Sequence, residues 1–125
     1  MGQDGCATAA GAAGMTPAVA LFRSLADETR LRIVSRLAAG EARVVDLTEE
    51  LGLAQSTVSK HLACLRDRGL VDYRVQGRQS FYALARLELM DMLAAAEDML
   101  EATGSAVALC PGYGADTPAV ARRAP

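Results

Sequence analysis

Tryptophan is absent from this 125-residue sequence, and only three tyrosines and two phenylalanines are present. No apolar stretch approaches the roughly 18 residues that a membrane-spanning helix requires. Near the N-terminus, Asp4 stands where a secretory signal would carry basic residues. These absences argue against a membrane or secreted protein and predict a cytoplasmic one. The abundance of alanine and leucine instead favours a single, mostly helical domain.

The residues needed for common enzyme chemistry are also missing. The sequence has no phosphate-binding glycine loop, no set of serine, histidine and aspartate with triad character, and no evident pair of carboxylates in a cleft. We therefore expect neither an enzyme nor an organic cofactor. Because His61 is the single histidine, a zinc site built from imidazoles is excluded. Three cysteines form a poor disulfide framework, which leaves metal binding, redox sensing and simple packing open.

Charge is distributed unevenly along the chain. The formal net charge is −2, which taken alone argues against a nucleic-acid partner. Residues 55–80, however, contain five basic and two acidic residues, so this window carries +3 and the remainder −5. A local basic surface on an acidic protein is sufficient for contacts with phosphates. The expected binding to DNA is modest and sensitive to salt.

The spacing of apolar residues and of helix boundary signals predicts the order of elements. Pro17 suits the first turn of one helix, Asp27 is a plausible N-cap for the next, and Gly40 is a stop. Further helices are expected over 44–51, 55–68 and 87–103, with strands over 70–75 and 79–84 joined by a turn. This order, α-α-α-α-β-β-α, is mainly helical with a small β-hairpin wing, which is typical of a winged helix–turn–helix.

The same pattern suggests three segments. Residues 1–14 are expected to be a flexible tail, 15–104 a domain for DNA binding and dimerisation, and 105–125 a second tail that contains Cys110. The first and last helices carry more apolar surface than a small core can cover. A homodimer formed through these two helices is the expected explanation.

The predicted helix over 55–68 has one apolar and one polar face. Val58, Leu62 and Leu65 fall on one stripe at 100° per residue, and short polar side chains with a lysine lie opposite. Such a surface suits a helix in the major groove of double-stranded DNA, since short side chains permit close approach to base edges. Arg78 and Gln79 in the wing turn could reach the backbone or the minor groove.

Three segments resemble the ArsR/SmtB family of winged-helix repressors. Residues 25–33 (LADETRLRI) are similar to the family signature LADPTRLRIL, 55–62 (QSTVSKHL) to its recognition helix, and 77–82 (GRQSFY) to its wing. The resemblance covers about residues 18–100 and implies a homodimer that represses its operon until an inducer weakens DNA binding. The groove-facing residues that it implies are Gln55, Ser56, Thr57, Ser59, Lys60 and His61.

The family's sensor positions do not all carry ligands here. The histidine and carboxylate pattern of the last helix is not kept at the matching positions, and residues 43–47 contain no cysteine. Cys64, in the run HLACLR, resembles the recognition-helix cysteine of the family's CmtR-like cadmium/lead sensors. Those sensors have a second cysteine where this chain has Arg68, and a further one in the C-terminal tail, for which Cys110 is the counterpart. Cys6 could supply a third sulfur.

The residues themselves favour Cys64 as a ligand. The thiol is expected about 120° from the apolar stripe, whereas a structural cysteine would prefer the buried face. Two or three thiolates favour soft ions, Cd(II) or Pb(II) and also Hg(II) or As(III), with Zn(II) a weaker candidate. The alternatives are a redox sensor in which Cys64 and Cys110 form a disulfide, and an interaction module that has lost DNA binding.

Overall fold

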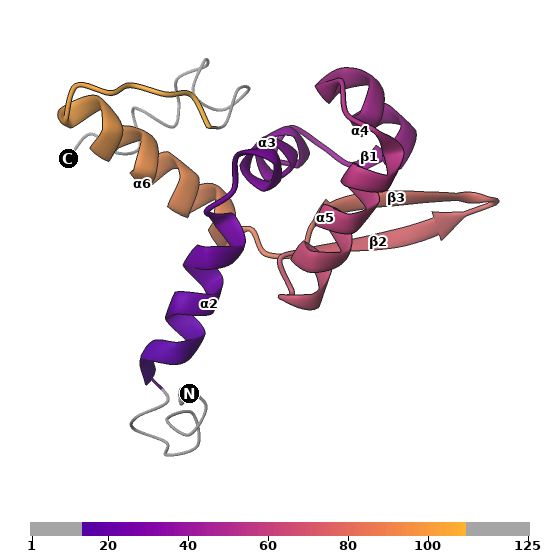
Figure 1. Ribbon diagram of the computed structural model, residues 1–125, viewed down its shortest axis with the longest axis horizontal. Coiled ribbons are helices and arrows are strands. Elements are labelled where there is room, and N and C mark those ends of the chain that lie inside the picture. The colour runs from indigo at the N-terminus through magenta and orange to yellow at the C-terminus, as the bar shows by residue number, and fades with distance from the viewer. Residues whose placement is uncertain (1–13, 110–125) are drawn as a thin grey trace.

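The computed structural model describes residues 14–109, and the expected order of helices and hairpin is confirmed (Figure 1). One short strand is added that the sequence did not predict. The elements are α2 (Met15–Leu25), α3 (Glu28–Leu37), β1 (Ala42–Arg43), α4 (Val44–Leu51), α5 (Gln55–Asp67), β2 (Val71–Gln76), β3 (Gln79–Leu84) and α6 (Glu88–Ala102).

The predicted start of α3 is confirmed, and its predicted end is close to the observed one. The Asp27 side chain caps the helix by accepting a hydrogen bond from the Arg30 backbone N–H at 3.0 Å. That hydrogen bond is the largest cause of a lowered pKa at Asp27, since it favours the charged carboxylate. The helix ends at Leu37, three residues before Gly40, which adopts a φ of 143° in the following turn. The expected stop at Gly40 was therefore slightly late.

A two-residue strand, β1, precedes α4 and was missed by the sequence prediction. Ala42 pairs with Tyr82 and Arg43 with Phe81, and the chain then turns directly into α4. The Asp46 carboxylate accepts hydrogen bonds from the Arg43 backbone and side chain, the closest at 2.7 Å. These contacts lower the pKa of Asp46 to about 2. The start of α4 is thus fixed to the sheet on one side and capped on the other.

The three strands form an antiparallel sheet in the order β1-β3-β2. Pairing of β2 with β3 runs from Val71 opposite Leu84 to Gln76 opposite Gln79, so the connection is a two-residue turn. Gly77 has a φ of 66° in this turn, a conformation that glycine adopts without steric cost. The predicted wing is confirmed, with its first strand one residue later than expected.

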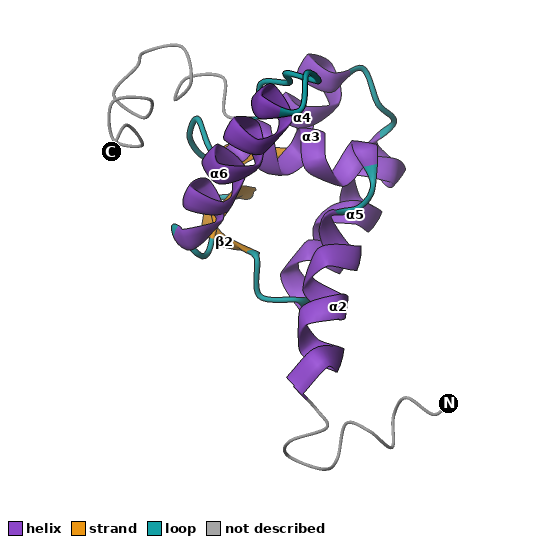
Figure 2. Ribbon diagram, turned by 90° about the vertical axis from the view of Figure 1, so that its left-hand side faces the viewer, coloured by secondary structure: helices purple, strands orange, loops and turns teal. Residues whose placement is uncertain are grey.

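The core lies where α3, α4 and α5 meet the base of the sheet and the start of α6. Its members are buried aliphatic side chains, of which Ile33, Leu47, Leu62, Leu65 and Leu89 are the largest. The helices α2 and α6 lie at the end of the molecule opposite the wing, and α2 projects from the rest (Figures 1 and 2). No helix between residues 14 and 109 is both long and apolar enough to cross a bilayer.

Large apolar side chains remain exposed on the two helices opposite the wing. On α2, Met15 is 74% exposed, Phe22 60% and Val19 48%. At α6, Leu87 is 74% exposed and Met99 64%. We refer to these five residues as the apolar end patch. Uncovered surface of this kind at one end of a small domain is typical of a protein interface.

Candidate nucleic-acid interface

The α5 helix presents the polar face that its sequence predicts. Val58, Leu62 and Leu65 have no exposed surface, which confirms the apolar stripe. The side chains that lie outward are exposed, whereas Thr57 and His61 are half-buried. The exposed polar residues on the first half of the helix are Gln55, Ser56, Ser59 and Lys60.

The N-terminus of α5 follows a tight turn and has no side-chain cap. Gly52 closes α4 in the left-handed conformation, with a φ of 68°, and the Leu53 N–H donates to the Thr48 carbonyl at 3.2 Å. The N-cap of α5 is Ala54, which provides no side-chain cap, and the first turn holds no acidic residue. The positive end of this helix dipole is therefore neither capped nor neutralised locally, which suits an approach to phosphate.

Two of the five basic residues predicted to form a phosphate-binding surface are engaged within the protein. Arg74 pairs with Glu41 at 3.0 Å and lies over the Phe81 ring. Arg66 lies 4.4 Å from the centre of the Tyr73 ring and 3.8 Å from the Asp72 carboxylate. These contacts of Arg66 on α5 and Arg74 on β2 reduce the charge that α5 and the wing offer to DNA.

Three other cations of this window form no ion pair with any residue between 14 and 109. Lys60 lies on the exposed face of α5, Arg68 at its C-terminal end, and Arg78 at the tip of the wing beside the exposed Gln79. The part of the +3 window that remains for phosphates is therefore mainly these three side chains. Figure 1 shows that α5 and the wing belong to the same end of the molecule, so both could contact one DNA duplex.

His61 was predicted to face the DNA, and one side of its ring faces inward instead. Its Nδ1 lies 3.3 Å from a terminal guanidinium nitrogen of Arg30 on α3. A contact to DNA through the other ring nitrogen stays a prediction. The sequence analysis missed Arg30 itself. An arginine three residues after an N-cap aspartate was the available signal, but its partner 31 residues away is a tertiary feature.

Of the three cysteines, Cys64 lies among the described residues. Cys64 has a free, half-buried thiol on α5, away from the fully buried stripe as expected. Cys6 and Cys110 lie outside the described residues. Among residues 14–109, no three histidine, cysteine or carboxylate side chains cluster in a way that could hold a metal ion. A site with two or more thiolates from one chain would combine Cys64 with Cys6 or Cys110.

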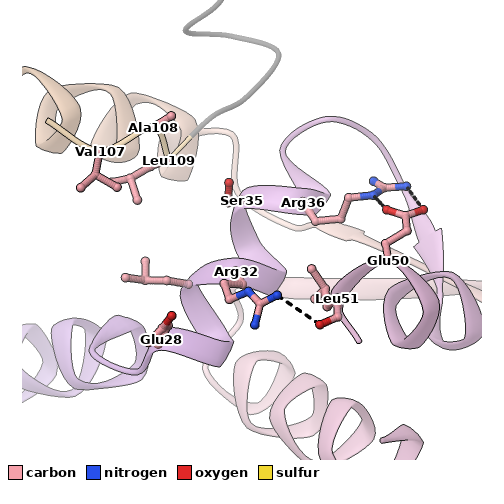
Figure 3. Close-up of a pocket in the computed structure, with 10 residues that line it drawn as sticks. Glu28, Arg32, Ser35, Arg36, Glu50, Leu51, Val107, Ala108 and Leu109 are labelled. Atoms are coloured by element: carbon pink, nitrogen blue, oxygen red, sulfur yellow. Dashed lines mark hydrogen bonds and ion pairs between the residues drawn. The ribbon is translucent and has the colours of Figure 1, made fainter. Parts of the chain in front are cut away.

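A cavity of about 560 Å³ lies between α3, the end of α4 and the segment 107–109 (Figure 3). The Leu109 N–H donates to Glu97 at 2.5 Å, and this contact holds the segment over α3. Arg36 pairs with Glu50 on the far wall. Cys64 is not among the lining residues. The sequence analysis did not identify this cavity, because it is formed by residues distant in the chain.

Comparison with known proteins identifies the family. Residues 27–73 match the family described as bacterial regulatory protein, arsR family. The regulator CmtR of Mycobacterium tuberculosis is 41% identical over 104 residues, which cover 83% of this chain and 80% of CmtR. The chain belongs to the ArsR family. Its members are DNA-binding transcriptional regulators and not enzymes, which confirms that expectation.

Solved structures place this ArsR-family chain among winged helix–turn–helix proteins. The cadmium sensor CmtR of M. tuberculosis superimposes with a TM-score of 0.54 at 45% identity, covering 62% of this chain and 80% of that one. Reduced HlyU of Vibrio cholerae gives 0.61 at 35% identity, with 73% and 92% covered. The homodimeric domain of Mb0332 from Mycobacterium bovis gives 0.62 at 27% identity, with 72% and 88% covered. The predicted fold class is confirmed.

Proposed function

We propose that the protein is a metal-responsive repressor in the cytoplasm that binds operator DNA as a homodimer. The observation that carries DNA binding is the uncapped, polar face of α5, held outward by a fully buried stripe. Gln55, Ser56, Thr57, Ser59 and Lys60 would contact the major groove. His61 would join them, and Arg78 and Gln79 would contact the backbone from the wing.

The dimer in this proposal forms through the apolar end patch. Phe22 and its neighbours are exposed on a helix that projects from the core (Figure 2). Burial of such side chains against a second copy would remove apolar surface from water. Two recognition helices related by a two-fold axis could then enter successive major grooves. The homodimeric relative Mb0332 supports this arrangement.

The inducer in this proposal is a soft metal ion, Cd(II) or Pb(II), held by cysteine thiolates. Cys64 would supply one thiolate from α5, Cys110 a second and Cys6 a third, and thiolate donors fit ions of this class. The similarity to CmtR of M. tuberculosis, a cadmium metal-sensor, supports this choice. Because Cys64 lies on the helix that contacts DNA, restraint of its thiol would change the position of that helix. A hundredfold loss of affinity requires a coupling of only about 3 kcal/mol.

The decisive experiment is a titration of Cd(II), Pb(II), Zn(II) and As(III) against a complex of the protein with its own promoter DNA. We expect binding without metal and release by Cd(II) or Pb(II). Cys64→Ser should bind DNA normally but resist release, and Ala63→Ser is the matched control for a new hydroxyl on the adjacent exposed position. Normal release of Cys64→Ser would show that the sensor site is wrong. No binding by the wild-type protein would contradict the repressor itself.

A thiol redox sensor is the second candidate. Two observations favour this function. Residues 14–109 contain no three-ligand metal cluster, and one of the similar solved structures is described as reduced HlyU. In that case Cys64 and Cys110 would form a reversible disulfide. Titration under anaerobic conditions separates the two proposals, since metal binding gives a thiolate charge-transfer absorption band and consumes no oxidant. Release of DNA by an oxidant alone, reversed by a thiol reductant, would support the redox function.

A further inference from the structure

The Arg30 side chain contacts two other helices from its place on α3. Its Nε donates to the Ser24 carbonyl at 2.6 Å, and one terminal nitrogen donates to the Arg23 carbonyl at 3.3 Å. The other terminal nitrogen lies 3.3 Å from Nδ1 of His61 on α5. All three guanidinium nitrogens therefore have a partner. A single side chain joins the end of the projecting helix α2 to the helix proposed to read DNA.

The surroundings of Arg30 hold this arrangement in place. Its backbone N–H is fixed by the Asp27 carboxylate. The Ser24 carbonyl belongs to the last turn of α2, where no further helical N–H follows, so an arginine is a fitting donor for it. The Arg23 carbonyl accepts from the Ala26 N–H at 3.2 Å as well as from Arg30. Ser24 is itself buried, and its hydroxyl donates to the Ala20 carbonyl at 2.8 Å. Arg30 thus completes the hydrogen bonding of a helix end.

The contact also bears on the tautomer of the histidine ring. An arginine side chain has donors only, so a hydrogen bond between the two side chains requires that Nδ1 of His61 accepts it and carries no hydrogen. In the neutral ring the hydrogen then lies on Nε2. The ring consequently offers a hydrogen-bond donor at Nε2, and DNA provides acceptors in its phosphate oxygens and in purine N7 atoms.

We propose that Arg30 is a positioning residue for DNA binding, which couples α2 to the recognition helix α5 and holds His61 as the Nε2–H tautomer. This inference rests on the proposed use of α5 in DNA recognition. Arg30 itself need not touch DNA. Its role is to fix the position of α5 relative to α2 and to make Nε2 of His61 a hydrogen-bond donor. A change in the position of α2 would thereby be transmitted to α5 through the guanidinium group of Arg30.

The chain provides a matched control on the same helix. Arg32 lies two residues further on and also donates to a main-chain carbonyl of a neighbouring helix, that of Leu51 at 3.1 Å. It has no hydrogen bond to α2 or to α5 within the described residues. Arg30→Lys and Arg32→Lys remove the same planar group and keep the same charge. Only the first removes the link to His61, because one ammonium cannot satisfy three separated acceptors.

The first measurement is the ¹⁵N spectrum of the imidazole ring, which distinguishes the two tautomers and is unambiguous because His61 is the single histidine. We expect the Nε2–H form alone in the wild-type protein and in Arg32→Lys, and a mixture of both tautomers in Arg30→Lys. This readout does not depend on DNA. An Nδ1–H tautomer in the wild-type protein, or identical ring spectra in all three proteins, would overturn the inference.

The second measurement is affinity for promoter DNA. Arg30→Lys should bind about tenfold more weakly, as expected for loss of a hydrogen bond to a charged donor, and Arg32→Lys should stay within about twofold. Equal affinities of the two variants would contradict the coupling role. If wild-type protein fails to bind, the proposed function is wrong, and the ring spectrum still decides the tautomer.

A second variant covers the case in which Arg30→Lys does not fold. His61→Asn keeps an acceptor oxygen near the Nδ1 position and removes the donor at Nε2, whereas His61→Ala removes both. We expect His61→Asn to retain the thermal stability of the wild-type protein and to lose affinity for DNA, and His61→Ala to lose both. Equal losses of stability in the two variants would show that Arg30 does not use His61 as an acceptor.

Discussion

The two ends of the molecule are constructed differently. At the wing end, α5 buries its apolar stripe completely within one chain and presents polar side chains outward, and the exposed apolar side chains, such as Val45 and Val75, lie on α4 and β2. At the opposite end, α2 and α6 leave Phe22, Met99 and other large apolar groups exposed. In the proposed dimer, the exposed groups of α2 and α6 would be covered by the second copy, whereas the apolar stripe of α5 is already buried within one chain. Mutations of buried residues at the wing end should therefore lower the free energy of unfolding, whereas mutations of exposed apolar residues on α2 and α6 should change dimer formation.

Truncation of the α5 stripe should have the largest effect. Leu62 has no exposed surface, so Leu62→Ala would leave a cavity in the core and lower the free energy of unfolding by about 3 kcal/mol. Urea denaturation followed by circular dichroism measures this. Ala63→Gly on the exposed face of the same helix is the control, with an expected cost of about 1 kcal/mol. Equal losses would contradict the assignment of the buried face.

A charge introduced into the apolar end patch should prevent formation of the proposed dimer. Phe22→Glu would place a carboxylate in the proposed dimer contact, and we expect a monomer by sedimentation with DNA affinity reduced at least a hundredfold, because each half-site would bind alone. The control is Glu28→Gln, an exposed position on the neighbouring helix that lies outside the patch. A Phe22→Glu variant that remains dimeric would place the interface elsewhere.

Removal of single cations should distinguish free from engaged basic residues. Lys60→Ala and Arg78→Ala are each expected to weaken DNA binding and to reduce the slope of log affinity against log salt by about 1. Arg74→Ala should change the slope less, because Arg74 already pairs with Glu41 and packs on Phe81. Fluorescence anisotropy over a salt series tests this. Equal slopes for Arg74→Ala and Arg78→Ala would contradict the assignment.

The smallest expected effect concerns acid stability at the start of α4. The pKa of Asp46 is lowered from its ordinary value of 3.8 to about 2 by Arg43. A lowered pKa in the folded state means that the contribution is present above about pH 4 and is lost as pH falls toward 2. Asp46→Asn should therefore make stability less dependent on pH in that window, as measured by thermal denaturation from pH 2 to 5. The same slope in both proteins would contradict this interaction.

Local patterns in the sequence were sufficient for the helices and the hairpin. The stripe of Val58, Leu62 and Leu65, the N-cap at Asp27 and the glycine turns depend on residues only a few positions apart. The strand β1 could not be predicted, since two residues have no periodicity and form a strand only by pairing with β3. The contact between Arg30 and His61 likewise depends on how α3 packs against α5.

At the candidate site, the exposure of the polar side chains was predicted from the sequence, whereas their contacts with other residues were not. The exposed polar residues of α5 follow from the helical period once the apolar stripe is known. The engagement of Arg74 and Arg66 by neighbouring side chains does not follow from the sequence, because the acidic and aromatic partners come from another turn or strand. Charge counts along the chain therefore overestimate the charge available to DNA.

The central position of β3 has a mechanical consequence. Through β1, this strand is joined to the capped start of α4, and through β2 it is joined to the end of α5. Helix α4, helix α5 and the hairpin are thereby joined through one central strand. In the proposed dimer, an inducer that moved this unit as a whole would change the separation and tilt of the two α5 helices and leave the shape of each DNA-binding unit unaltered.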